Sequence, residues 1–108
     1  MAFEKEQRES ERFPVTPSAA CVFASPVLEE YTPPRLRNIS TKGIGLIASQ
    51  ALEVGLMMVV KLANPAKNFT KTMLVRVAHV TPQPGGSYLI GCTLDAPLTY
   101  EELCMLVM

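Results

Sequence analysis

Short apolar runs, each ended by proline or glycine, make up most of the chain between residues 19 and 94. Every run has the length of a strand, and prolines or glycines between the runs provide turn signals. The predicted strands are Ala19–Ala24, Arg35–Ile39, a stretch around Leu46–Ala48, Leu56–Leu62, Thr70–Thr81 and Tyr88–Leu94. Six short strands divided in this way predict an all-β barrel.

The two ends of the chain depart from the strand pattern. Residues 1–12 are charged and nearly devoid of apolar groups, so little there can offset the entropy of ordering the backbone. We therefore expect a flexible N-terminal segment at 1–12 and a folded domain at 13–108. Within the domain, Tyr100–Met108 predicts one short helix, which Thr99 can cap and whose first turn carries two glutamates.

Charge is balanced over the whole chain and segregated within it. The 108 residues form one small domain with a formal net charge of zero. From Arg35 to Arg76 there are seven basic residues against one acid, whereas from Thr93 to the end there are three acids and no base. The middle of the chain therefore favours an anion. The zero total argues against the dense basic field of a nonspecific nucleic-acid binder.

Cysteine and histidine spacing predicts neither a zinc site nor a disulfide framework. Cys21, Cys92 and Cys104 show no CxxC spacing, and the only histidine, His79, is remote from them in sequence. We expect reduced, buried thiols and a strand position for His79. No apolar run approaches the ~20 residues that span a bilayer, so we expect a soluble, cytoplasmic protein without membrane insertion.

No pattern in the chain supports catalysis. There is no nucleophile beside a base, no pair of carboxylates at a cleft motif and no metal-ligand set. We therefore expect a binding module that is not an enzyme and that needs no cofactor.

Two short polar motifs suggest what is bound. Arg8 and Arg12 lie four residues apart, and about 25 residues later the chain reads Asn-Ile-Ser-Thr-Lys-Gly from Asn38 to Gly43. Arginine presents a planar fork of donors that fits phosphate or the edge of guanine, and its flat face stacks on a base. Alternatively, the arginines are a solvated i,i+4 pair, and Asn38 and Ser40 only hydrogen-bond their own turn.

In this order and at this distance the motifs resemble the RxxxR and (D/N)xSxxG motifs of PilZ domains, bacterial receptors for cyclic di-GMP. The resemblance runs from Arg8 to about Val107 and includes Ile90-Gly91-Cys92 on the last predicted strand. It implies a six-stranded antiparallel barrel with a C-terminal helix. It also implies cyclic di-GMP as the ligand and a downstream protein as the partner.

The resemblance assigns roles to individual residues. Arg8 and Arg12 would clasp phosphate and guanine from the N-terminal segment, while Asn38 and Ser40 bind the other side. Gly43 would keep the turn open for close approach, by adopting a positive φ, by leaving room, or both. Lys42 either reaches a phosphate or points to solvent. Whether one ligand or a stacked pair binds is left open by Gln7, which is not the extra basic residue of many family members.

Two other functions compete with a cyclic di-GMP receptor. One is a degenerate PilZ domain that acts only through protein-protein interaction, against which the intact motifs count. The other is a small barrel that binds single-stranded nucleic acid through its basic middle. Such barrels need aromatic stacking platforms. The chain has no tryptophan, and among its aromatic residues only Phe69 and Tyr88 fall in the later strands, so this reading is the weakest.

Overall fold

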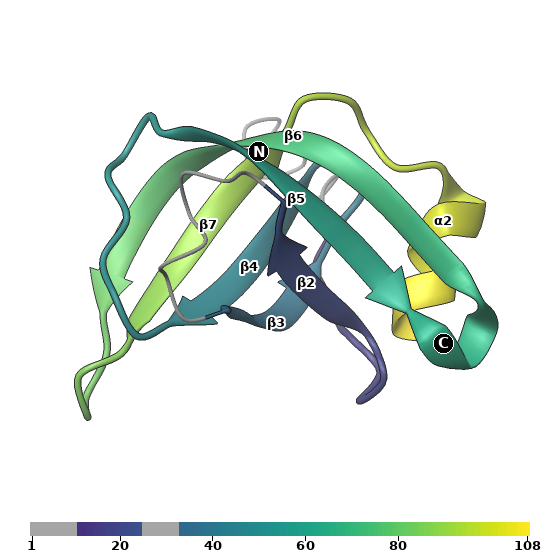
Figure 1. Cartoon of the computed structure of the whole chain (residues 1–108), viewed down its shortest axis with the longest axis horizontal. Coiled ribbons are helices and arrows are strands. Elements are labelled where there is room, and N and C mark those ends of the chain that lie inside the picture. The colour runs from purple at the N-terminus through teal and green to yellow at the C-terminus, as the bar shows by residue number, and fades with distance from the viewer. Residues whose placement is uncertain (1–10, 25–32) are drawn as a thin grey trace, which may run out of the picture.

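The computed structural model describes residues 11–24 and 33–108, which form a strongly curled antiparallel sheet with one helix at its end (Figure 1). The strands are β1 (Phe13–Pro14), β2 (Ala20–Phe23), β3 (Arg35–Ile39), β4 (Gly43–Ala48), β5 (Met57–Asn64), β6 (Phe69–Pro82) and β7 (Tyr88–Leu94). A short 3-10 turn, η2 (Pro65–Lys67), joins β5 to β6, and helix α2 (Tyr100–Val107) follows β7. The predicted all-β class and the C-terminal helix are confirmed.

The strand count is seven rather than the predicted six, because β1 is a strand of only two residues. Phe13 pairs with Ile39 and Pro14 with Asn38 at the outer edge of β3. A proline cannot donate to a ladder, so it is tolerated on an edge strand such as this one. This two-residue pairing was not predicted from the sequence.

The order of strands across the sheet is β1-β3-β4-β7-β6-β5-β2, and every neighbouring pair is antiparallel. The sheet curls into a half-barrel, and the long strand β6 arches over its top in the view of Figure 1. The two edges, β1 and β2, are short strands, which limits the backbone they offer to other chains.

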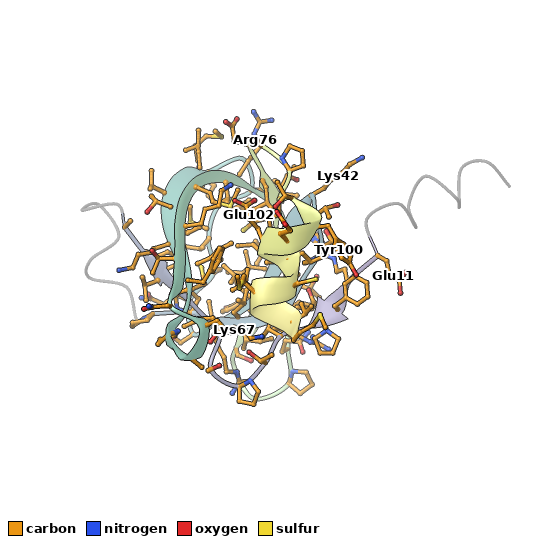
Figure 2. The ribbon with its side chains drawn as sticks, turned by 90° about the vertical axis from the view of Figure 1, so that its right-hand side faces the viewer. Glu11, Lys42, Lys67, Arg76, Tyr100 and Glu102 are labelled. Atoms are coloured by element: carbon orange, nitrogen blue, oxygen red, sulfur yellow. The ribbon has the colours of Figure 1, made fainter. Side chains whose placement is uncertain are left out.

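The core lies inside the curl and is built by alternation along each strand. In β6, for example, Met73, Val75 and Val77 are buried while the residues between them are exposed. Helix α2 covers one end of the half-barrel, as Figure 2 shows, and it buries Leu103 and Leu106 against the core. The inner face of the sheet is therefore occupied by packed side chains, and a ligand has to bind on the outer face or at a rim.

Helix α2 begins with the predicted cap. The hydroxyl of Thr99 accepts a hydrogen bond from the backbone N–H of Glu102 at 3.1 Å, and the Glu102 carboxylate accepts one from the N–H of Thr99 at 2.9 Å. The same carboxylate binds the Lys71 ammonium of β6 at 2.6 Å. This capping box fixes the start of the helix and ties it to the sheet.

A second polar junction holds the other end of the helix. Asn64 at the end of β5 is 1% exposed. Its amide oxygen accepts from the Ser18 hydroxyl at 2.7 Å, and its amide nitrogen donates to the carbonyl of Met105 at 2.7 Å. Nearby, the backbone N–H of Thr16 donates to the carbonyl of Leu106 at 3.0 Å. The segment that follows β1 is thus fixed to both β5 and α2.

The three cysteines are free, and burial rather than pairing defines their chemistry. Cys21 and Cys92 are buried, as expected, whereas Cys104, for which burial was also expected, is only partly buried. Desolvation by burial raises the pKa of Cys21 and of Cys92 to about 12. Both thiols therefore stay protonated near neutral pH and are poor nucleophiles.

The described part of the chain, 11–24 and 33–108, contains no cluster of three potential metal-ligating side chains. In the same residues no helix has the length and apolarity needed to cross a bilayer.

Candidate functional site

Most of the motif residues meet on the outer face of the sheet, where β1, β3 and β4 adjoin. Arg12 immediately precedes β1, and Asn38 lies near the end of β3. Ser40 and Gly43 bound the turn into β4, with Lys42 between them. Arg8 lies outside the described residues.

Arg12 and Asn38 are joined directly. The Nη1 group of Arg12 donates a hydrogen bond to the amide oxygen of Asn38 at 3.0 Å, across 26 residues of sequence. The pairing of β1 with β3 aligns the two side chains, because Pro14 lies opposite Asn38 and places Arg12 just beyond. Arg12 is exposed and Asn38 half-buried, so the pair lies at the surface and its guanidinium is accessible to a ligand.

Ser40 plays a different part from Asn38. It is 1% exposed, and its hydroxyl accepts hydrogen bonds from the backbone N–H groups of Gly43 at 3.0 Å and Lys42 at 3.2 Å. The backbone N–H of Ser40 also donates to the carbonyl of Gly43 at 2.9 Å. The geometry matches the alternative in which this serine hydrogen-bonds its own turn, so its side chain holds the β3–β4 connection in shape.

Glycine at position 43 is required by space and not by backbone conformation. The glycines with positive φ among the described residues are Gly55, Gly85 and Gly86, so the expectation of a positive φ at Gly43 was wrong. A Cβ at Gly43 would lie 2.8 Å from the carbonyl oxygen of Cys92 and 3.2 Å from Nη2 of Arg12. Gly43 therefore leaves room for the arginine to lie close against the backbone of the sheet.

Two further glycines continue this surface, and sequence reasoning did not single out their role. Asn38 pairs with Gly45, Gly45 with Gly91, and Gly91 with His79, which makes one row across β3, β4, β7 and β6. A Cβ at Gly45 would overlap the side chain of Asn38, and a Cβ at Gly91 would overlap the ring of His79. The middle of the row is therefore bare backbone, with polar side chains reaching over it from both ends.

Arg12 lies between two small pockets on this face. The first, of about 150 Å³, is lined by Arg12, Asn38, Gly45, His79, Leu89, Ile90 and Gly91. The second, of about 190 Å³, is lined by Arg12, Ser40, Lys42, Gly43, Cys92 and Thr93. Each is smaller than the ~300–1,000 Å³ of most small-molecule sites. Together they suit an extended ligand whose parts lie on either side of the guanidinium.

Positive charge extends from Arg12 along the rim. Lys42 and Arg76 both point outward in Figure 2. Arg76 pairs across the sheet with Thr93, and so does Gly43 from the other side. Arg12 also acts on the buried thiol of Cys92, since its charge lowers the pKa that burial raises. The field at this face thus favours an anion, although Asp95 beside Arg76 reduces it at the far end.

The arrangement supplies what a phosphorylated purine needs. A guanidinium offers bidentate donors to phosphate or to guanine, and an amide can both donate and accept. The glycine backbone forms a floor against which the Asn38 amide and the His79 ring lie closely, so both polar groups border the pocket beside Arg12. The sequence analysis did not select Gly45, Gly91 or His79 as candidate site residues. For Gly91 the available signal was its place inside the predicted strand Tyr88–Leu94, where glycine often marks a close approach.

Comparisons with known proteins agree with this fold. No curated protein matches the chain in a sequence search. Among solved structures, the chain is similar to the Bacillus subtilis inhibitor of motility (MotI/DgrA), with a TM-score of 0.60 and 16% sequence identity. The match covers 87% of this chain and 46% of that one, so the present chain spans about half the length of that protein. The likeness shows the fold.

The sequence itself matches a family model. The model for the PilZ domain matches residues 6–104, which include both motifs, the glycine row and the first part of α2. This chain therefore belongs to the PilZ domain family.

Proposed function

We propose that this protein is a receptor for cyclic di-GMP and passes the signal to a partner protein as a non-catalytic adaptor in the cytoplasm. The observation that carries the proposal is the hydrogen bond from Arg12 to Asn38 over the bare backbone of Gly43 and Gly45. It joins the second arginine of one family motif to the first residue of the other. Membership of the PilZ family supports the ligand's identity.

In this proposal the described residues divide the work of binding. Arg12 donates to a phosphate or a guanine edge, and Asn38 orients the guanidinium through its amide oxygen. Gly43 provides the clearance, and Ser40 keeps the turn in shape through its buried hydroxyl. Lys42 lines the second pocket and adds positive charge there. Arg8 would supply the second guanidinium.

Binding would also create the signal, because residues 1–12 carry both proposed clasping arginines. Laying the residues that precede Arg12 across the outer face of the barrel would produce a new surface for the partner without a rearrangement of the sheet. Ordering about five residues costs on the order of 5–10 kcal/mol. Several charge-assisted hydrogen bonds at ~1.5–3 kcal/mol each offset that cost.

Titration calorimetry tests the binding step. Cyclic di-GMP should bind with a dissociation constant between tens of nanomolar and tens of micromolar, on the order of −6 to −10 kcal/mol, whereas GTP and cyclic AMP should not. Absence of heat with high micromolar protein, together with failure to displace a fluorescent analogue, would contradict the proposal.

Hydrogen exchange tests the signalling step separately. Amides between residues 8 and 12 should become protected when ligand is added, while those from Val75 to Leu94 in β6 and β7 change little. Equal exchange of the N-terminal segment with and without saturating ligand would remove the ordering mechanism and leave the binding claim intact.

A second candidate function is a protein-interaction module that binds no nucleotide. Exposed apolar side chains at the two ends of α2 favour it, since Tyr100 at its start and Met108 just after it are 75% and 71% exposed. In Figure 2 the Tyr100 side chain points away from the helix. The same calorimetry separates the two candidates, because this alternative requires no heat with cyclic di-GMP.

A further inference from the structure

The β-bulge in β6 changes which face of the sheet the following residues occupy. From Met73 to Val77 the odd-numbered residues of the strand point into the core. Strict alternation would bury His79 as well. The register shifts between Val77 and His79, however, with Ala78 as the extra residue. A bulge of this kind re-aims the side chains that follow it.

After the bulge the histidine is on the outer face. His79 is exposed, whereas Val80 is partly buried and packs on the core. Three atoms of the imidazole, Cε1, Nε2 and Nδ1, lie where a Cβ of Gly91 would stand. The ring therefore lies across the bare backbone of β7, and any larger residue at position 91 would displace it.

This position puts the imidazole in the first of the two pockets beside Arg12. His79 lines it from the β6 side, while Arg12 and Asn38 line it from the β1 and β3 side. Within residues 11–24 and 33–108 we find no hydrogen bond from the His79 ring, and the ring lines the pocket, so its pocket-facing part can contact a ligand. The pocket volume of about 150 Å³ admits one part of a dinucleotide and not the whole.

We propose that His79 is a further ligand-contacting residue of this site, and that its imidazole stacks on one base of the bound cyclic dinucleotide. This inference rests on the proposed function. Purine bases have a π-face that stacks on aromatic side chains, histidine included. The described residues that line the two pockets include no other aromatic side chain. His79 thus provides the stacking platform on the side of the glycine floor opposite Arg12.

Calorimetry on three variants tests the contact. His79→Ala should bind cyclic di-GMP about tenfold or more weakly, the scale of losing one stacking platform. His79→Phe keeps an aromatic ring and should stay within about threefold of the parent protein. Thr72→Ala, which removes an exposed side chain elsewhere on β6, should bind as the parent does. Thermal unfolding of each variant checks that the fold is retained.

The histidine is unique in the chain, so its nuclear magnetic resonance signals need no further assignment. Cyclic di-GMP should shift the imidazole signals of labelled parent protein, and the shift should saturate with the calorimetric affinity. Parent binding without this shift, undiminished binding by His79→Ala, or a His79→Phe variant as weak as His79→Ala would each overturn the stacking contact and leave the receptor function standing. If the parent protein binds no cyclic di-GMP, the proposed function fails first and this inference fails with it.

Discussion

Two asparagines occupy opposite environments in this fold and show how the same amide can serve binding or stability. Asn64 is 1% exposed and joins Ser18, Met105 and η2 through both ends of its amide. Asn38 is half-buried on the outer face, and its amide oxygen accepts from the exposed Arg12. A buried amide with every group satisfied fixes a structure, whereas an amide at the surface can exchange partners when a ligand arrives.

The largest expected effect is the loss of stability on removal of the inner amide. Asn64→Ala leaves the Met105 carbonyl and the Ser18 hydroxyl without their partner. The free energy of unfolding, measured by urea denaturation, should fall by about 2–4 kcal/mol. Asn38→Ala is the matched control, and its free energy of unfolding should be lower than that of the parent by less than about 1 kcal/mol. Equal losses of stability in the two variants would contradict the conclusion that Asn64 stabilises the fold more than Asn38 does.

The next effect concerns affinity instead of stability. Arg12→Ala and Arg8→Ala should each weaken cyclic di-GMP binding by about 1.5–3 kcal/mol, the scale of a charge-assisted hydrogen bond. For Arg12→Ala, the free energy of unfolding should stay within about 0.5 kcal/mol of the parent value, because this side chain is exposed. Lys61→Ala removes the same charge from β5 and is the control. Undiminished affinity in both arginine variants would contradict the assigned roles even if the parent binds.

Ser40→Ala refines the comparison between the buried Asn64 and the surface Asn38, because Ser40 belongs to a binding motif and yet is buried. Loss of its hydroxyl removes the oxygen that accepts from the N–H groups of Lys42 and Gly43 in this turn. The free energy of unfolding should fall by about 1 kcal/mol, and affinity should fall only as far as the turn is distorted. Ser49→Ala, at an exposed position, is the control. A loss of affinity with unchanged stability would instead place the Ser40 hydroxyl in direct contact with the ligand.

The smallest effect belongs to the cap of α2. The hydrogen bond from Lys71 lowers the pKa of Glu102 below its usual 4.5, with a further contribution from the N–H of Thr99. A group whose pKa is lower in the folded state stabilises the fold at pH values above its pKa in the unfolded state. This stabilisation is lost as the pH falls through the pKa of the folded state. Glu102→Gln should therefore be less stable than the parent by under about 1 kcal/mol at neutral pH.

Glu101→Gln changes the other glutamate in the first turn of α2, and it is the control for a loss of stability that is specific to the capping box. The difference in stability between Glu102→Gln and the parent should begin to shrink below about pH 4.5 and should be lost as pH falls through the lowered pKa of Glu102 in the folded state. A difference that is constant from neutral to strongly acidic pH would mean that the charge of Glu102 contributes nothing.

Much of the fold was predictable, because local signals agreed with the final structure. Period-two patterns and turn residues marked six strands, and Thr99 with two glutamates marked the start of the helix. Strand β1 was not predicted, since a two-residue pairing has no periodicity and contains Pro14. The role of Asn64 was missed for a related reason: its partners lie 41 and 46 residues away in sequence.

The site was predictable only in part. The two motifs identified Arg12 and Asn38, and the structure joins them by a hydrogen bond. The position of His79 depends on a bulge that interrupts alternation, and the one sequence sign of it was a shift from Val75 and Val77 to Val80. The need for glycine at Gly91 depends on a side chain from a neighbouring strand, which no local pattern reveals.

The backbone hydrogen bond of Thr16 limits how far Arg12 can move from the binding site. Thr16 is held by the carbonyl of Leu106, four residues along the chain from Arg12. Even if the two-residue pairing of β1 opened, the four-residue connection to Thr16 would keep Arg12 within ~14 Å of Thr16. Closing onto a ligand would then be an intramolecular step at an effective concentration on the order of millimolar. The arginine would rebind far faster than the ligand could diffuse away, so one short tether can lengthen the lifetime of the complex.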